Sequence, residues 1–458
     1  MRDVVLLAML LIAIPLILRR PWVGVIVWVV VSVMNPHRLG WGFMYDFPVG
    51  YVVALTTLAS MLFSRERKRF PVNSVTLTLI LFVVWMNVTL LFALHPEAAF
   101  TQWVKVMKIM FMLMIGMAIL HTRQHLTALI WAIVVSLGFY GVKGGIFALA
   151  TGGNFKIWGP PGSDVGDNNA IAFALVVIFP LMYYLSTSAS NKWIKFGLRL
   201  AMVLCALSIL TSHSRGAFLA LAAMATFLVL KSEKRVALGL AVGVLAALLL
   251  AFMPESWLNR METIKTYEQD ASSMGRINAW WMAVNLANDR PLVGGGFDIY
   301  YPDVFALWAP NPTDVHAAHS LYFAALGEHG YVGLLLFLAF CLFAWRTGTV
   351  VAKMTKGKAE LRWAASLGRM LQVSMVGYAV GGAFLSVLYF DVFYYVVALM
   401  VLLREIVDGN NNATQRKASI QERAPEEHSL LKPRQPGPLG STTNGRSRAV
   451  SLDRSAHD

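Results

Sequence analysis

The chain has 458 residues, of which 57% are hydrophobic and only 14% are charged. Soluble domains carry about a quarter charged residues, so this composition excludes an ordinary soluble domain. The formal charge of +14 does not indicate a nucleic-acid partner, because many basic residues flank apolar runs, as the positive-inside rule describes. Cys205 and Cys341 lie in apolar runs and predict neither a disulfide framework nor a zinc site.

Apolar runs of about 15 to 25 residues recur along the chain, and most can cross a hydrocarbon core of about 30 Å. We therefore predict an all-α, polytopic membrane protein with about 12 transmembrane helices. The first two runs are short and form either a hairpin or one broken element, so 12 or 13 crossings are expected. The predicted spans are 4–18, 22–34, 47–63, 75–93, 103–120, 125–150, 169–187, 196–211, 216–230, 236–253, 320–345, 364–388 and 391–406.

Lysine and arginine residues predict the orientation of these spans. When the spans alternate, five basic stretches fall on one side, which is therefore expected to be cytoplasmic. They are "RR" at 19–20, "SRERKR" at 64–69, "NKWIK" at 191–195, "KSEKR" at 231–235 and "KMTKGK" at 353–358. The opposite side carries the long loop 254–319. The membrane domain is expected over 1–407, and 408–458 is polar enough to form a disordered cytoplasmic tail.

Four lysines on the expected external side break this pattern. Lys105 and Lys108 lie in "QWVKVMKIMF", Lys143 lies in "FYGVKGGIF", and Lys156 lies in the following loop. Charges at membrane depth are costly and usually functional, although snorkelling to the surface explains any one of them equally well. Together they predict an outward-facing basic cavity that suits an anion such as a phosphate.

Arg215 stands at a very short turn between two predicted spans, in "LTSHSRGAFLALAA". Thr211, Ser212 or Ser214 is expected to cap the second helix. One interpretation is a simple interface anchor. The functional interpretation is a guanidinium held at the membrane boundary, where its fork suits the phosphates of a lipid-linked substrate.

A second arginine, Arg276, lies in "SSMGRINAWWMAVNLA" within the long external loop. Ser272 or Ser273 is expected to cap a helix that carries Arg276 and Trp280 at i and i+4, on one face. A surface arginine is the alternative interpretation.

The stretch "VHAAHSLYFAALGEHGYVGLLLF", residues 315–337, places His319 where a span begins. A histidine between water and lipid, with a reference pKa near 6.5, suits proton transfer at neutral pH. The alternatives are a satisfied interfacial histidine and a role for His316, one helical turn away. Tyr322 and Phe323 are expected to share the face of His319 and to line a sugar or lipid site.

Glu328 follows in the same span, about 13 Å deeper than His319 in a regular helix. Nine residues of helical rotation turn it to the opposite face, so it is expected to be a buried structural carboxylate paired with a group on another helix. Gly327, Gly330 and Gly333 predict close backbone packing around it.

Three of these motifs resemble one family. "HSLYFAALGEHGYVG" resembles the His-Asn/Ser…Glu-x-Gly-x-x-Gly signature of the O-antigen ligase superfamily, "SHSRGAFLALA" its Ser-Arg-Gly-Ala segment, and "GRINAW" its Arg-x-x-x-Trp segment. The order of the motifs fits as well, and the long external loop falls between the Ser-Arg-Gly-Ala segment and the histidine motif. The N-terminal "RRPWVGVIVWVVVSVMNPHRLGWGFMYDFP" is similar to ligases that accompany exosortase systems, so the resemblance covers roughly residues 1 to 407.

The resemblance implies a metal-independent, GT-C-like glycosyltransferase of the bacterial inner membrane, with its active site facing the periplasm and no cofactor. The implied donor is a glycan on undecaprenyl diphosphate, and the implied acceptor is the lipid A–core oligosaccharide. His319 takes the position of the family's essential histidine, and Arg215 and Arg276 take those of its two arginines. Ser320 stands where asparagine is commoner.

We therefore hypothesise an inverting displacement at the anomeric carbon. His319 acts as general base, a role worth typically about 10²–10⁴-fold, while Arg215 and Arg276 bind the diphosphate. The four lysines widen the basic surface, and Asp391, at an external helix end, orients a partner. The external loops contain no Asp-x-Asp pair to hold a metal.

Other functions remain open from the sequence. An O-antigen polymerase or a protein O-glycosylation ligase would use the same donor with another acceptor. A transporter of polyprenyl-linked sugars would instead need ionisable residues through the bilayer midplane and pseudo-symmetric halves, neither of which is clear. A structural partner of an exosortase system would give no reason for Arg215, Arg276 and His319 to share a side.

Overall fold

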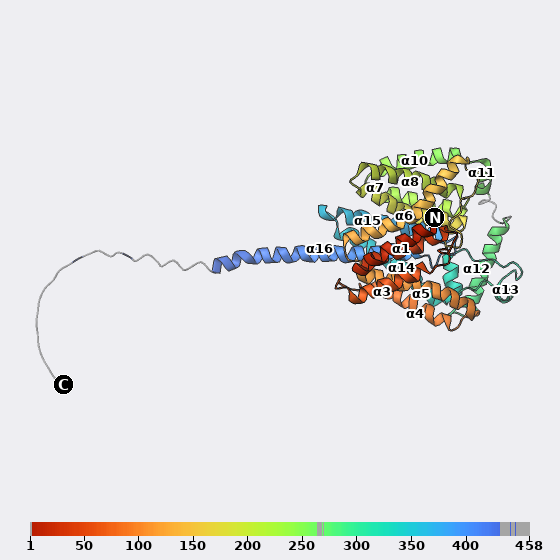
Figure 1. The fold of residues 1–458 in the computed structure, drawn as a ribbon, viewed down its shortest axis with the longest axis horizontal. Helices are drawn as coiled ribbons and strands as arrows, with labels where there is room; N and C mark the ends of the chain where they lie inside the picture. The colour runs from red at the N-terminus through yellow and green to blue at the C-terminus, as the bar shows by residue number, and fades with distance from the viewer. Residues whose placement is uncertain (1, 263–267, 269, 431–439, 441–444, 446–458) are drawn as a thin grey trace, which may run out of the picture. The chain divides into compact units, whose positions relative to one another are not determined.

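A helix forms at each of the predicted spans in the computed structural model (Figure 1). The structure describes residues 2–262, 268, 270–430, 440 and 445, and the side chains of 413–430 lie outside this description. No β-strand occurs within these ranges. The elements are α1 (Arg2–Arg19), α2 (Pro21–Met34), η1 (Pro36–Leu39), α3 (Val49–Phe63), α4 (Ser74–Leu90), α5 (Pro96–Ile119), α6 (Arg123–Ala150), α7 (Asn168–Ser188), α8 (Lys192–Thr211), α9 (Arg215–Lys231), α10 (Arg235–Phe252), α11 (Glu255–Glu262), α12 (Ala271–Asp289), α13 (Pro302–Trp308), α14 (Leu321–Met354), η3 (Ala359–Leu361), α15 (Arg362–Gly382) and α16 (Asp391–Leu430).

The chain forms two units, Met1–Gly409 and Asn410–Asp458, and the first holds every residue considered below. The helix α16 continues to Leu430, and most of the predicted tail beyond that point lies outside the described residues. The domain boundary at 407 and the disorder of the tail therefore stay predictions.

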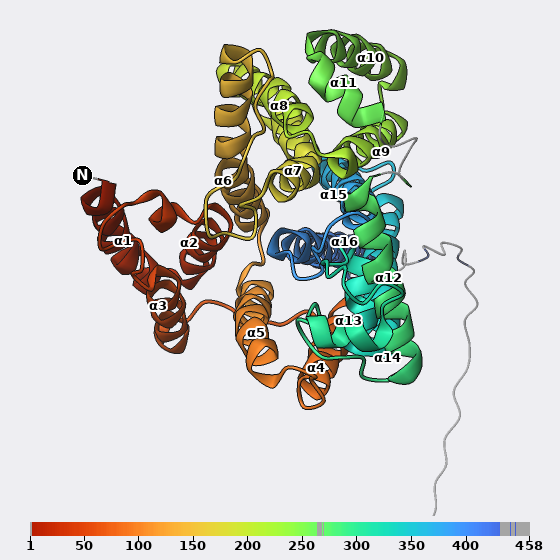
Figure 2. The ribbon, with the colours of Figure 1, turned by 90° about the vertical axis from the view of Figure 1, so that its right-hand side faces the viewer.

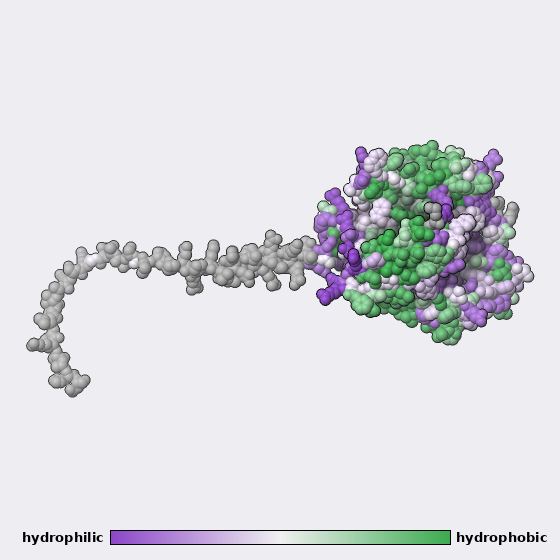
Figure 3. Space-filling model, viewed as in Figure 1, coloured by the Kyte–Doolittle hydropathy of each residue, from purple (hydrophilic) through white to green (hydrophobic). Residues whose placement is uncertain are grey.

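Six described helices are long and apolar enough to cross a membrane: α5, α6, α7, α8, α10 and α14. Three shorter apolar helices, α2, α3 and α4, accompany them. Figure 3 shows apolar side chains over much of the visible face, as expected where lipid replaces water as the solvent. The protein is thus an all-α, polytopic membrane protein, as predicted, while the count of 12 or 13 crossings stays a prediction.

The centre of the helical unit is formed by α7, the first part of α16 and α15. Of the most apolar 18-residue stretch of α7, 89% is buried. A helix that is buried on all sides is expected to be apolar all round, as α7 is. Tyr378 on α15 stacks on Phe393 of α16, with ring centroids 3.6 Å apart. In Figure 2, which looks at the end of the unit that carries α12 and α13, α16 lies near the middle.

The predicted long loop 254–319 contains three helices, α11, α12 and α13. Buried residues of this region form a small core of their own, which includes Met282, Leu286, Ile299 and Phe305. The amide Nδ2 of Asn278 on α12 donates to two loop carbonyls at 2.8 and 2.9 Å, so α12 is the frame on which the approach to α14 is built.

The helix α14 is broken at Gly330, whose φ is +68°. The carbonyls of Gly327 and Glu328 accept the N–H groups of Gly295 and Gly296 at 2.8 and 2.9 Å. The glycines predicted to pack closely do so against this loop as well as against helices. A Cβ on Gly330 would lie 2.3 Å from the carbonyl oxygen of Leu292, so glycine is required here for space and for conformation.

Candidate functional site

Arg215 is the first residue of α9, and the turn before it is as short as predicted. Ser214, one of the three expected caps, accepts the N–H of Ala217 at 3.3 Å. A Cβ on Gly216 would lie 2.8 Å from Cβ of Phe384, so α9 begins in close contact with the segment after α15. The local sequence therefore fixes the position from which the Arg215 side chain extends.

The cap of α12 differs from the prediction. Asp270, not Ser272 or Ser273, is the N-cap, and its carboxylate accepts the N–H and the hydroxyl of Ser273 at 3.0 and 2.7 Å. The serines lie in the first turn instead. A carboxylate suits this position better, because it complements both the helix N-terminus and the neighbouring guanidinium of Arg215.

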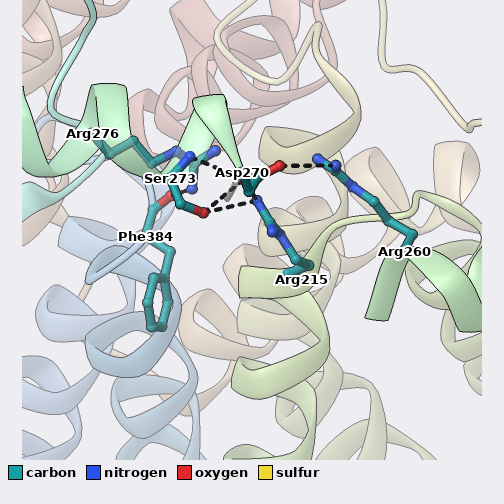
Figure 4. Close-up of polar contacts among 6 residues, drawn as sticks. All are labelled: Arg215, Arg260, Asp270, Ser273, Arg276 and Phe384. Atoms are coloured by element: carbon teal, nitrogen blue, oxygen red, sulfur yellow. Dashed lines mark hydrogen bonds and ion pairs between the residues drawn. The ribbon is translucent and has the colours of Figure 1, made fainter. Parts of the chain in front are cut away.

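Three arginines surround that single carboxylate (Figure 4). Arg215 Nη2 lies 2.6 Å and Arg260 Nη1 3.6 Å from the oxygens of Asp270. Arg276, from α12, donates through Nη1 to the Phe384 carbonyl at 3.4 Å. Its buried Nε has no hydrogen-bond partner within the described part of the chain. The cluster therefore has excess positive charge and an unused buried donor, the features of an anion site.

The ionisation states at this cluster follow from its contacts. Burial raises the pKa of Asp270, but hydrogen bonds from Arg215 and Ser273 outweigh it and lower the pKa from 3.8 to about 2. Burial, together with the charge of Arg215, lowers the pKa of Arg276 from 12.5, and an arginine nevertheless stays protonated at neutral pH. The three guanidinium groups thus surround the carboxylate of Asp270, while Asp167 acts on Arg276 through its charge.

His319 lies just before α14, which begins at Leu321. Its φ is +43°, a left-handed conformation that is uncommon for residues other than glycine. The prediction that Tyr322 and Phe323 share a helical face with His319 is therefore wrong, since His319 has no helical face. Tyr322 instead donates its hydroxyl to the Ala379 carbonyl at 2.9 Å.

Trp280 holds the backbone next to His319. Its indole N–H donates to the Ala318 carbonyl at 2.6 Å, and its ring stacks on Phe323 with centroids 4.9 Å apart. Trp280 is one turn after Arg276 on α12, as its spacing predicted. The same helix therefore carries a guanidinium of the cluster and the anchor of the histidine backbone.

The electrostatics connect His319 to the arginine cluster. Burial, the charge of Arg276 and, to a smaller extent, His316 lower the pKa of His319, while Asp167 raises it. The net direction is downward from 6.5, so the imidazole is neutral at neutral pH. The charge of Arg276 thus acts on His319, and the charge of Arg215 acts on Arg276. His319, Arg276 and Arg215 therefore lie within electrostatic range of one another in sequence, each with the next.

His316, the competing histidine, has a different environment. Its Nδ1 lies 2.8 Å from the carboxylate of Asp314, and its ring packs against Gly275 at the start of α12. This contact does not decide between His316 and His319 as the base, because catalytic histidines also have carboxylate partners; the choice of His319 stays a prediction from the family motif.

The predicted lysines divide between two places. Lys105 on α5 forms an ion pair with Asp164, in the loop between α6 and α7. Asp391, at the start of α16, accepts the hydroxyl of Ser32 at 2.5 Å and lies within electrostatic range of Lys105 and Asp164. These residues form a second polar group, which we call the Lys105 group.

The other lysines have separate surroundings. Lys108 lies over the ring of Tyr51, 4.5 Å from its centroid. Lys156 is exposed and acts electrostatically on His213, which lies two residues before Arg215. Lys143 is exposed on α6, and within the described chain no interaction joins it to either polar group.

Glu328 is buried, as predicted, and accepts the hydroxyl of Tyr389. Tyr389 also lies 2.6 Å from Nε2 of His329, whose Nδ1 contacts the Thr89 hydroxyl at 2.8 Å. The partner of Glu328 thus belongs to the segment before α16, not to a helix. This network links α4, α14 and that segment.

Three charged residues of the site were not predicted: Asp167, Arg260 and Asp270. Asp270 stands three residues before Ser273 at a helix start, a capping pattern that was readable in the sequence. Asp167 caps α7 in the same way, and its proximity to Arg276 and His319 depends on the fold. Within the part of the chain described, no three His, Cys, Asp or Glu residues are grouped as metal ligands.

The family described as O-antigen ligase matches residues 200–338, the part that contains Arg215, Arg276 and His319. A family of unknown function, DUF5935, matches residues 1–190. This part contains Ser32, Lys105 and Asp164 of the Lys105 group, whereas Asp391 lies outside both matches. A search of curated proteins found no match. Members of the matched ligase family are glycosyltransferase-like ligases. The match over residues 200–338 supports a relation of this chain to the O-antigen ligase superfamily.

Proposed function

We propose that this protein transfers a glycan from undecaprenyl diphosphate to the lipid A–core oligosaccharide, on the periplasmic side of the bacterial inner membrane. The family supports the broader statement, a membrane enzyme of the O-antigen ligase or polymerase type. The observation that carries the specific proposal is the neutral imidazole of His319 beside the arginine cluster.

The arginine cluster binds the diphosphate of the donor. Arg276 offers its unused Nε–H and the rest of its fork, and a guanidinium fork matches two phosphate oxygens. Asp270 holds Arg215 and Arg260 by their ion pairs, so these donors are oriented before the substrate arrives. Such preorganised charge is most effective where negative charge develops in the transition state.

His319 activates the acceptor. Its neutral imidazole takes the proton of an acceptor hydroxyl, and the oxygen attacks the anomeric carbon of the donor glycan from the face opposite the diphosphate. The new glycosidic C–O bond forms as the bond to the diphosphate oxygen breaks, with inversion. The leaving diphosphate keeps the electron pair, and the arginines stabilise its charge without a metal. The proton stays on His319 until solvent removes it.

The Lys105 group belongs to the acceptor side in this proposal. The helix α5 carries Lys105 and Lys108, and α16 begins with Asp391. The partner of Lys105, Asp164, lies three residues before Asp167, whose charge acts on His319. Acceptor phosphates or carboxylates would meet Lys105 and Lys108, and Asp391 would orient the acceptor. His316 and Lys156 extend the basic surface around the arginine cluster.

The division of labour between donor binding and proton transfer predicts different kinetic defects. His319→Ala removes the base, so turnover should fall by about 10²–10⁴-fold while donor binding stays within a few-fold. Arg215→Ala removes a phosphate contact and an ion pair, so donor affinity itself should fall. The measurements are ligation by the reconstituted protein and binding of undecaprenyl diphosphate.

His316→Ala is the matched control for His319→Ala, because the two histidines are neighbours and only one has a carboxylate partner. Equal loss of donor binding in His319→Ala and Arg215→Ala would refute the proposed roles. An assay that offers lipid A–core, a second lipid-linked glycan and a protein acceptor in parallel separates ligase, polymerase and protein ligase.

A further inference from the structure

A large apolar cavity lies away from the arginine cluster, between α7, α8, α9 and α10. Its volume is about 660 Å³, and most of its wall is aliphatic or aromatic, with Phe179, Met202 and Leu221 as examples. Ordinary core packing leaves few voids larger than a water molecule. A space of this size within an apolar bundle is therefore a candidate ligand site.

The helix α10 forms one wall of this cavity and has no buried residue. The α10 residues that line the cavity follow helical spacing and are Ala237, Leu238, Ala241, Val242, Leu245, Ala246, Leu249 and Leu250, with Lys234 just before the helix. This stripe rises by about 20 Å, roughly two-thirds of the hydrocarbon thickness of about 30 Å. The inner face of α10 thus meets an open apolar space along nearly its whole length.

The charges of the cavity wall are all at one end. Arg199 and Lys234 line it together with the hydroxyl residues Ser186 and Thr187. The neighbouring carboxylate, Glu233, is engaged with Arg369 at 2.8 Å. The cavity therefore combines a long apolar body with a cationic mouth.

This cationic mouth is at the end of the bundle opposite Arg215. Arg215 begins α9, whereas the mouth lies where α7 and α9 end and where α8 and α10 begin. A lipid with its phosphate at this mouth therefore has its head group in the leaflet opposite the arginine cluster. This position separates it from the lipid-linked donor proposed above.

We propose that the cavity binds an anionic phospholipid. Its phosphate lies between Arg199 and Lys234, with hydrogen bonds from Ser186 or Thr187, and its acyl chains lie along the inner face of α10. Basic pockets between transmembrane helices bind anionic head groups in this way. The bound lipid supplies the packing that α10 lacks within the protein. The inference is independent of the reaction proposed for the arginine cluster.

Native mass spectrometry of the delipidated full chain tests this inference, with phosphatidylglycerol and phosphatidylcholine as the probes. Wild type should retain phosphatidylglycerol preferentially. The double variant Arg199→Gln/Lys234→Gln should lose roughly tenfold or more of that affinity, since two cations are removed. The control Lys192→Gln/Lys195→Gln removes two charges of α8 that do not line the cavity and should bind like wild type.

A second pair of variants tests the apolar part of the site. Ala241→Phe fills the cavity and should weaken phosphatidylglycerol binding, whereas Leu240→Phe, on the outer face of α10 and 67% exposed, should not. Equal retention of both phospholipids, unchanged binding in Ala241→Phe, preferential binding of undecaprenyl diphosphate, or equal binding of free glycerol phosphate would each overturn the proposal.

Discussion

At the scale of single residues, the environment of His319 explains why this histidine suits the role of a base. Two opposing charges act on it: Arg276 lowers its pKa and Asp167 raises it. Burial adds to the lowering, so the neutral form persists to a pH below the ordinary histidine value. His316 has a different partner, the carboxylate of Asp314 at 2.8 Å.

The pH dependence of ligation should report these two charges separately. The base is active when neutral, so kcat/KM falls as the pH decreases through the pKa of His319. Arg276→Gln removes a cation that lowers this pKa, and the acid limb should move to higher pH. Asp167→Asn removes an anion that raises it, and the limb should move to lower pH. The measurement is the pH profile of kcat/KM.

Asp167→Asn is a matched control as well as a test, because asparagine caps a helix about as well as aspartate and α7 should stay intact. If the acid limbs of the Arg276→Gln and Asp167→Asn profiles moved in the same direction, this would contradict the electrostatic account. An unmoved limb in both variants would assign the titration to another group.

At the scale of helices, the limits of the sequence are clearest. Apolar length located a helix at each predicted span, because lipid demands continuous apolar helices. Boundaries that depend on tertiary contacts were not predicted: α15 ends at Gly382, before the expected 388, and α14 continues to Met354, beyond the expected 345. The break at Gly330 was not predicted either, since the Gly295 and Gly296 N–H groups that satisfy the freed carbonyls come from a distant loop.

The candidate site shows the same division. Arg215 and His319 were recognisable because a cation or an imidazole at the end of an apolar run is unusual, and Arg276 was identified by its motif. Asp167 and Arg260 resemble ordinary surface charges in the sequence, and their place beside the cluster depends on how α7 and α11 pack. The four lysines were predicted to share the external side, but their contacts place Lys105 beside Asp164 and Lys156 near His213, in two separate groups.

Replacing Gly330 should destabilise α14 strongly. In Gly330→Ala the added Cβ meets the Leu292 carbonyl, and φ of +68° is strained for alanine, so the loop 291–296 should detach with a cost of about 2 kcal/mol or more. Thermal unfolding in detergent and amide exchange at Gly295 and Gly296 measure this effect.

Gly197→Ala on α8 is the control for that experiment. Its Cβ would meet nothing within 4 Å, and helical glycine to alanine usually stabilises by about 0.5 to 1 kcal/mol. If Gly330→Ala were as stable as Gly197→Ala, the break would not be a constraint of the fold.

At the scale of the whole molecule, the arginine cluster and His319 draw on α7, α9, α11, α12 and the segments beside α14 and α15. In the proposed reaction the guanidinium groups of the cluster neutralise the diphosphate without a metal, so ligation by the purified protein should continue in excess EDTA at an unchanged rate. Loss of activity that Mg²⁺ or Mn²⁺ restores would contradict this mechanism. Binding of undecaprenyl diphosphate in EDTA separates an effect on the donor from one on chemistry.

The orientation of the molecule decides which substrates reach the cluster. The loop with Lys156 lies at the end of the bundle where α6 ends and α9 begins, and Lys356 follows α14 at the other end; both side chains are exposed. In a background with Cys205→Ala and Cys341→Ala, Lys156→Cys should react with a membrane-impermeant maleimide in intact spheroplasts. Lys356→Cys should react only after permeabilisation, because the basic stretch 353–358 is expected to be cytoplasmic. The reverse pattern would place His319 on the cytoplasmic side, away from a periplasmic donor, and the proposed reaction would then be impossible at this site.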